Sequence, residues 1–194
     1  MILYDTWAVS PSAVNATLIR AAAAVAGAGA VSILSNDVSV QGCGYKLLFT
    51  SAGNSSGMSF TIVGDALGKP GKTTEVLTGP NATTGTTTNY WVRIDSVTAS
   101  AAATGNISIG ITGSLALPRT RIRGVHYVGA AAAGTMVIAL NTAATVLLNI
   151  DTPASATFAE MVGPISVPTY NTTGALDFAV VTLTQVAKCT LICG

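Results

Sequence analysis

Hydrophobic and polar residues alternate along most of this chain. The alternation is strictest in five segments that are rich in β-branched and aromatic residues. These segments are 45–50 (YKLLFT), 58–63 (MSFTIV), 73–77 (TTEVL), 90–97 (YWVRIDSV) and 107–112 (ISIGIT). Turn sequences rich in Gly, Ser and Asn separate them at a spacing of about 8–12 residues, which is typical of an antiparallel sandwich. The pattern predicts a β-sandwich domain over residues 27–117, completed by short segments at 30–34 and 38–40.

A second series of alternating segments follows Pro118. Its members are 135–140, 145–150, 165–167, 176–183 and 188–193. The stretch RTRIR comes directly after Leu117 and Pro118 and indicates a boundary there. We therefore predict an all-β fold with two antiparallel β-sandwich domains in tandem, Ig-like or jelly-roll-like, the second a smaller domain over 118–194.

Residues 1–26 are predicted to form an N-terminal arm. A serine cap and an alanine run favour a short helix over 12–20, while three nearby glycines oppose it, so this region reads as mixed. The first residues, MILYDTW, are apolar and aromatic at a free terminus. Tyr4 and Trp7 are therefore expected either to fold back or to pack on a neighbour.

Charge is scarce in this sequence. Charged residues make up 9% of the 194 residues, against roughly 25% in an average soluble protein. The formal net charge is +1, so no global field attracts nucleic acid or an anionic membrane. The longest apolar run, 21–34, is too short to span a bilayer, and no basic segment that would begin a signal peptide precedes it. We expect no nucleic-acid partner and no membrane association.

Residues that could support chemistry are sparse as well. The eight acidic residues are scattered, and His126 is the only histidine in the sequence. The turn LGKPGK at 67–72 lies between two predicted strands, and we interpret it as a hairpin turn rather than a phosphate loop. We predict no catalytic residue, no cofactor and no metal site, and a structural role for His126.

The three cysteines are predicted to be buried thiols that act as small hydrophobic residues. Cys189 and Cys193 share a strand face, but roughly 13 Å separates their Cα atoms, which is too far for a disulfide. Cys43 lies far away in the sequence.

Five asparagines begin N-x-[ST] sequences, which are glycan acceptors in secreted eukaryotic proteins. They are Asn15, Asn54, Asn81, Asn106 and Asn171. Turn preference in a chain rich in Asn, Ser and Thr explains them here.

Two groups of side chains are candidates for a partner interface. On an extended chain Arg119, Arg121 and Arg123 face one way. They could be solvated or paired within the protein, bind carboxylates of a partner, or, with weaker support, contact nucleic acid.

The second group lies in 90–97. Strict alternation puts Trp91, Arg93, Asp95 and Val97 on one face, toward solvent or a neighbour. The opposite face, which carries Tyr90, is then the better candidate for the core.

The order of turns and strands over residues 50–110 is specific. A SAGN turn precedes the strand FTIVG. The segment TEVLTGPNA follows, and a threonine-rich segment then leads into the aromatic strand. The segment SVTAS and the strand ATGNISIG close the series. These 61 residues resemble virion structural proteins of tailed bacteriophages. Related turns often carry Asp or Asn where this chain has Lys69 and Lys72, so the local charge differs.

This resemblance implies a non-enzymatic capsid decoration or cement protein on the virion surface, assembled in the bacterial host cytoplasm. Its implied partners are the major capsid protein and further copies of itself, with a trimer as one arrangement. One alternative is a head–tail connector, tail adaptor or appendage protein of the same virion. A less favoured one is a carbohydrate-binding adhesin in which Trp7, Tyr90 or Trp91 stacks on sugars.

Overall fold

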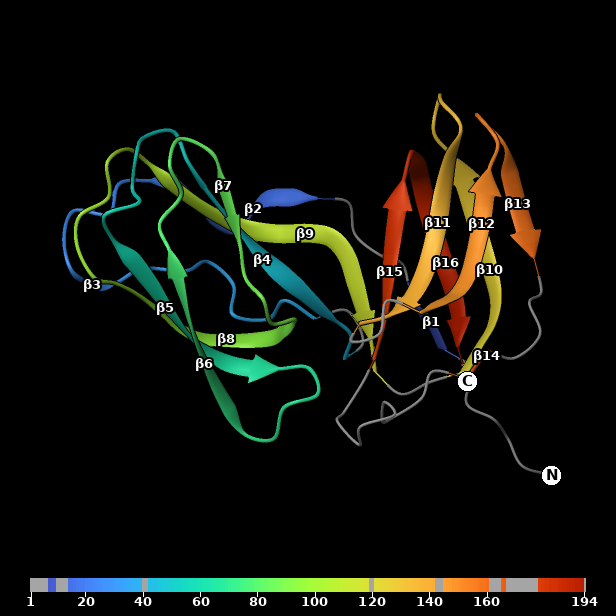
Figure 1. Ribbon diagram of the computed structural model, residues 1–194, viewed down its shortest axis with the longest axis horizontal. Helices are drawn as coiled ribbons and strands as arrows, with labels where there is room; N and C mark the ends of the chain where they lie inside the picture. Colours follow the sequence, from blue (N-terminus) through green and yellow to red (C-terminus); the bar gives the residue numbers. More distant parts are fainter. Residues whose placement is uncertain are drawn as a thin grey trace. The chain divides into compact units, whose positions relative to one another are not determined.

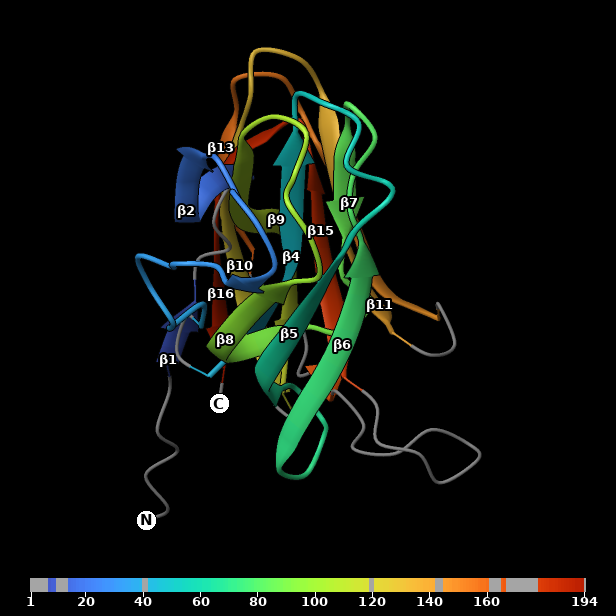
Figure 2. The ribbon, with the colours of Figure 1, turned by 90° about the vertical axis from the view of Figure 1, so that its left-hand side faces the viewer.

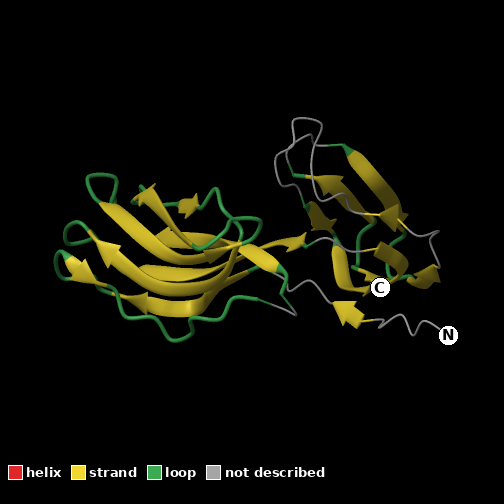
Figure 3. Cartoon of the chain, turned by 90° about the horizontal axis from the view of Figure 1, so that it is seen from below, coloured by secondary structure: helices red, strands yellow, loops and turns green. Residues whose placement is uncertain are grey.

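The computed structural model describes residues 7–9, 14–39, 42–118, 121–141, 145–160, 165–166 and 178–193. Over these residues the chain forms strands, turns and loops without any helix (Figure 1 and Figure 3). The strands pair in antiparallel fashion. The predicted all-β antiparallel class is therefore confirmed.

The chain divides into two compact units. The β4–β8 unit consists of Ala13–Ser39 and Cys43–Gly113, and the β10–β16 unit consists of Met1–Ser12, Val40–Gly42 and Ser114–Gly194. The division falls inside a single strand, so that strand contributes residues to both units. The domain limits derived from the sequence, 1–26, 27–117 and 118–194, stay a prediction.

The five segments of strict alternation are all strands in the β4–β8 unit, whereas Ala30 alone lies in a strand among the described residues of the predicted segments 30–34 and 38–40. The strands are β2 (Asn15–Ala23), β3 (Gly29–Ala30), β4 (Gly44–Ser51), β5 (Ser59–Ala66), β6 (Lys72–Thr78), β7 (Thr84–Thr86), β8 (Trp91–Ala99) and the first part of β9 (Ile107–Leu117). Strands β9, β4, β8, β5 and β6 follow one another in sheet order, while β2 pairs with β9, β3 with β8 and β7 with β4. Strands β5 and β6 form a hairpin and lie side by side in Figure 2. Strand β6 is the last strand in the sheet order. The hairpin turn at 67–71 confirms the interpretation of LGKPGK.

Alternation along β4 and β5 builds the core of this unit. Leu47 and Phe49 on β4 are fully buried, as are Phe60 and Ile62 on β5. The rings of Phe49 and Phe60 are tilted by 37° with centroids 5.0 Å apart, which is a favourable aromatic geometry. Each buried side chain of this size contributes about 1.5–3 kcal/mol. This core anchors the loops that connect the strands.

The uncertain region at 12–20 contributes to a strand rather than a helix. Residues of β2 pair with β9 at Asn15–Ile111, Arg20–Ile109 and Ala23–Ile107, with register shifts between these positions. Ile19 is fully buried. Helix propensity is a weak preference, and here pairing with β9 and burial of Ile19 override the alanine run.

The β10–β16 unit contains the remaining strands. They are β1 (Trp7–Val9), β10 (Arg121–Gly129), β11 (Gly134–Leu140), β12 (Val146–Thr152), β13 (Thr157–Glu160), β14 (Ile165–Ser166), β15 (Ala179–Thr184), β16 (Val186–Cys193) and the end of β9. Strand β10 pairs with β13, β14 and β16, and β16 also pairs with β1. Strand β11 lies between β12 and β15. Strand formation in the second alternating series is thus confirmed wherever the structure describes it.

Candidate interaction surface

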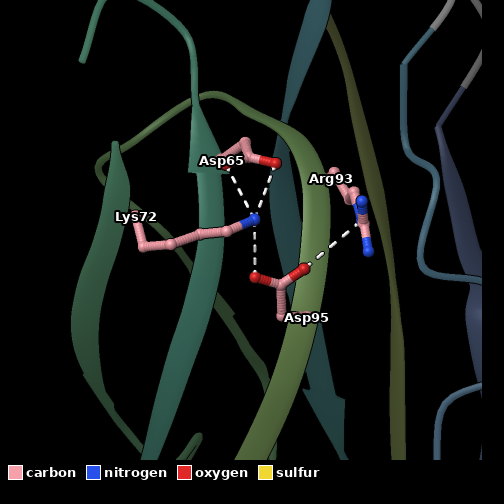
Figure 4. Close-up of polar contacts among 4 residues, drawn as sticks. All are labelled: Asp65, Lys72, Arg93 and Asp95. Atoms are coloured by element: carbon pink, nitrogen blue, oxygen red, sulfur yellow. Dashed lines mark hydrogen bonds and ion pairs between the residues drawn. The ribbon is translucent and has the colours of Figure 1, made fainter. Parts of the chain in front are cut away.

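Four charged side chains from three successive strands form a network on the β4–β8 unit (Figure 4). Lys72, at the start of β6, extends across β5, and its Nζ atom lies 2.9 Å from Oδ1 of Asp65 and 2.7 Å from Oδ2 of Asp95 on β8. The Nε atom of Arg93 lies 3.3 Å from the other carboxylate oxygen of Asp95. All four side chains are partly exposed, and such ion pairs contribute little to stability one by one. Their structural effect is to fix the direction of the Lys72 side chain.

The network favours the charged form of its members. Hydrogen bonds to Asp95 and Asp65 raise the pKa of Lys72, and the hydrogen bond from Lys72 lowers the pKa of Asp95. Nearby, the backbone and hydroxyl of Ser39 donate to Asp37 and lower its pKa, with a smaller contribution from Arg93. A lysine with a raised pKa is a poor nucleophile, and an acid with a lowered pKa is a poor proton donor at neutral pH. The arrangement is suited to ion pairing.

The predicted outward orientation of Trp91 is wrong. Trp91 is 0% exposed and Val97 is buried, whereas Arg93 and Asp95 are exposed as predicted. Two bulges cause the difference, because Asp95 and Val92 are extra residues between the pairs that β8 makes with β5. With these two residues set aside, buried and exposed positions alternate along the strand.

Gly64 allows β5 to approach β8 at the first of these bulges. A Cβ atom at Gly64 would lie 2.2 Å from the carbonyl oxygen of Arg93. The Nε1 atom of Trp91 is buried and has no hydrogen-bond partner among the described residues. Trp91 is therefore a core residue of the unit and is removed from the candidate interface.

Three turns of the stretch 50–110 converge on one another in the β4–β8 unit. We call residues 51–58, 79–84 and 100–106 the turn cluster. The backbone of Ser55 donates to Pro80, and the backbone of Ala82 donates to Gly53. Gly53 packs so closely on the third turn that a Cβ atom would lie 1.8 Å from the carbonyl oxygen of Thr104. Backbone contacts of this kind make the cluster a rigid surface.

The turn cluster carries no charged side chain. Its exposed residues are Asn, Ser, Thr, Ala and Gly. An open hollow of about 200 Å³ lies within it, lined by the residues Asn54, Ser55, Gly57, Met58, Ala101, Ala102 and Thr104. A surface of this composition can contact a partner through shape and hydrogen bonds, with little dependence on salt.

Two of the N-x-[ST] sequences make local hydrogen bonds. Oδ1 of Asn54 accepts hydrogen bonds from both the backbone and the hydroxyl of Ser56, at 3.1 and 2.8 Å. Asn15 and Thr17 repeat this arrangement. At Asn54 the hydroxyl two residues after the asparagine thus stabilises a turn, as the sequence interpretation proposed, whereas Asn15 and Thr17 lie in β2.

A buried arginine that the sequence did not single out organises the loop after β2. The five N–H groups of Arg20 donate to Ile107 O, to Ser32 O and Oγ, and to Ala23 O and Ala24 O. A cavity of about 260 Å³ lies beside it, lined by residues 24–32. Because its donors are all used within the unit, Arg20 acts as a structural clamp on this loop.

The other candidate interface residues are placed only in part. Tyr4 and Arg119 lie outside the described residues. Trp7 is in β1 and Arg121 in β10, but their side chains are not described. Arg123 is half-buried beside the fully buried Ile122, as alternation predicted for that pair. A partner role for these residues stays a prediction.

The three cysteines are buried, as predicted. Cys189 lies 3.4 Å from the sulfur of Met136, and burial raises the pKa of its thiol to about 12. His126 lies half-buried in β10, opposite Ala159 and Thr190.

The charged network could have been found in part from the sequence. Asp65 and Lys72 flank the predicted hairpin turn, and in the hairpin they pair directly. Asp95 joins them only because β8 lies beside β5 in a particular register, which the sequence does not state.

Within the described residues no group of three or more His, Cys, Asp or Glu side chains is arranged to hold a metal ion. The same residues contain no helix of the length and hydrophobicity needed to cross a membrane. Searches of protein-family models, curated proteins and solved structures found no match to this chain.

Proposed function

We propose that this chain is a non-enzymatic structural protein of a tailed-bacteriophage virion that decorates and stabilises the capsid shell. One observation supports the proposal most directly. The turns that carry the resemblance, 51–58, 79–84 and 100–106, are brought together as one rigid uncharged surface. Binding residues are often placed on loops held by a rigid scaffold.

The proposal includes a β-sandwich for each unit and an arm at the N-terminus. It also includes the major capsid protein and further copies of the chain as partners. A capsid shell presents the same binding site many times. Each copy of this protein would bind one such site through an uncharged contact surface. Burial of apolar and hydrogen-bonding surface would then supply the binding free energy, rather than charge attraction.

The aromatic residues argue against the carbohydrate-binding alternative. Trp91 is fully buried and Tyr90 is nearly so, which leaves neither ring free to stack on a sugar. The third residue suggested for that role, Trp7, has no described side chain.

Counting copies in purified virions tests the location. Quantitative mass spectrometry should find hundreds of copies per particle, and cryo-electron microscopy should place their density over the shell. About 5–12 copies with density confined to the tail or the connector would instead assign the chain to that structure. Absence from the particle would refute both assignments.

A charge placed in the turn cluster tests the binding surface. Ala102→Lys should weaken binding to particles stripped of this protein by at least about tenfold, because the lysine must be desolvated on docking. Ala28→Lys, at an exposed alanine outside the cluster, is the matched control and should bind normally. Both variants should keep the melting temperature of the unmodified protein. Equal binding by both variants would exclude the cluster as the contact.

A further inference from the structure

Strand β6 is a long and regular edge. It pairs with β5 from Lys72 to Thr78 without a register shift, and it ends the sheet order. In the described part of the chain its other side has no backbone partner. An edge strand of this kind offers a row of unpaired N–H and C=O groups to a second strand. Natural proteins usually protect such edges with charges, prolines or bulges.

The two charges of β6 are both engaged within the unit. Lys72 leans away from the free edge, across β5, to reach Asp65 and Asp95 (Figure 4). The carboxylate of Glu75 accepts hydrogen bonds from the backbones of Thr88 and Asn89 and from the Asn89 amide. The strand also lacks proline. Within the described part of the chain, this edge thus has neither a proline nor a bulge, and both of its charges are engaged inside the unit.

Other outer strands of the sheets are less regular. The pairing of β2 with β9 contains two register shifts, and the pairing of β12 with β11 contains one. Val76, in the middle of β6, is 64% exposed. Valine is favoured at strand positions where neighbouring side chains cover it, so this exposure is unusual. Threonines flank it at 74 and 78 on the same exposed face.

We propose that β6 is a self-association edge, at which two copies of this chain pair β6 with β6 in antiparallel fashion about a two-fold axis at Val76. This register opposes Val76 to its own copy and Thr74 to Thr78 on both sides. Pairs of β-branched residues and of threonines stabilise antiparallel neighbours. An axis at Glu75 would instead oppose two carboxylates, which is unfavourable.

The partner is a second copy because the pattern of β6 is complementary to itself. Each strand brings an edge whose two charges are engaged within its own unit, and the most exposed apolar residue of each strand lies opposite its copy. The contact is isologous and closes as a dimer. It specifies the self-association that the proposed function includes, although it concerns the free protein and does not require a shell.

A cysteine placed on the axis tests the register. In antiparallel pairs the Cα atoms of opposed residues lie about 4.5–5.5 Å apart, within the range for a disulfide. Val76→Cys should therefore form a covalent dimer under mild oxidation. The native cysteines are buried, so the introduced thiol is the one that can react. Val146→Cys, at a valine 56% exposed on β12, is the matched control and should stay largely monomeric under denaturing electrophoresis.

Charge at the same position tests the contact without a cross-link. Sedimentation should show a concentration-dependent dimer for the unmodified protein. Val76→Lys and Val76→Glu alone should each raise the dissociation constant by about tenfold or more, and mixing them should restore dimers as a heteropair. Val146→Lys should leave the dimer unchanged. Because Val76 is exposed, its variants should fold like the unmodified protein. Circular dichroism and melting temperatures check that they do.

Three results would overturn the proposal. The unmodified protein could be monomeric at all concentrations tested. Val76→Lys could leave the assembly, whether a dimer or a trimer, unaffected. Val146→Cys could cross-link as efficiently as Val76→Cys. A dimer that depends on Val76 in a protein absent from virions would support the edge contact while refuting the capsid function, so the two proposals fail separately.

Discussion

The Nζ atom of Lys72 lies 2.7 Å from Oδ2 of Asp95 although their strands, β6 and β8, do not pair with each other. Strand β5 runs between them and contributes Asp65 to the same ammonium group. One lysine therefore links three strands and holds its charge over the middle of the sheet. This contact directs the Lys72 ammonium group away from the outer edge of β6.

The network predicts a defined dependence of stability on pH. The pKa of Asp95 is lowered from 3.8 in the folded protein. Its contribution to the free energy of unfolding is therefore present above pH 3.8 and is lost as pH falls through the folded pKa. Lys72 has a pKa raised from 10.5, so its contribution is present below that value and is lost as pH rises through the folded pKa. The difference in unfolding free energy between the unmodified protein and Lys72→Met should thus be constant from about pH 5 to pH 9 and shrink on both sides.

Urea unfolding at a series of pH values measures this difference. Lys69→Met, in the same turn, is the control, because no ion pair is recorded for Lys69 among the described residues. A pH profile shared by the two variants would show that the network makes no specific contribution.

Close packing of the turn cluster makes one glycine indispensable. Gly53→Ala should lower the free energy of unfolding by about 1–3 kcal/mol, because the new Cβ would lie within 1.8 Å of a backbone oxygen and the turns must separate. Gly57→Ala, in the same turn, meets nothing within 4 Å and should cost less than about 0.5 kcal/mol. Denaturant titrations compare the two, and equal losses would contradict a rigid cluster.

The clamp formed by Arg20 should be costly to remove. Arg20→Met leaves the carbonyl oxygens of Ala23, Ala24 and Ile107 without this donor, and we expect a loss of about 2–4 kcal/mol. Arg93→Met, at an exposed arginine, should change stability by less than about 0.5 kcal/mol. Thermal and urea unfolding measure both. A small loss for Arg20→Met would mean that water replaces the guanidinium.

Thiol labelling should report global unfolding. Cys43 and Cys193 are fully buried, and burial raises the pKa of Cys189 to about 12, so none presents an accessible thiolate at pH 8. A disulfide reagent should modify less than about a tenth of the thiols in the native protein within minutes and all three in urea. Rapid labelling of one thiol without denaturant would reveal local opening around it.

The sequence predicted the strands well because alternation is a local property. Segments 45–50 and 73–77 became β4 and β6 with ends shifted by one residue. The hairpin between β5 and β6 was predictable for the same reason, since Pro70 and Gly71 lie between two alternating runs.

Properties that depend on pairing between distant strands were not predictable. The partner of Lys72 on β8 and the packing of Gly53 on Thr104 both depend on register. The strand at 15–23 was missed because its pairing with β9 outweighs a local preference for helix. Arg20 gave no sequence signal, since four of its five acceptors are backbone oxygens.

The two bulges of β8 give this strand an unusual hydrophobic spacing. The large buried residues of this strand, Trp91, Ile94 and Val97, are three positions apart, a spacing normally associated with one side of a helix. Val92 and Asp95 thus act as inserted residues that rephase the strand twice. Deleting Asp95 alone would leave buried and exposed residues alternating in the same register against β5, whereas deleting a paired residue such as Ser96 would exchange inside and outside on one side of the deletion. Loss of a paired residue of β8 should therefore be far more destabilising than loss of a bulge residue.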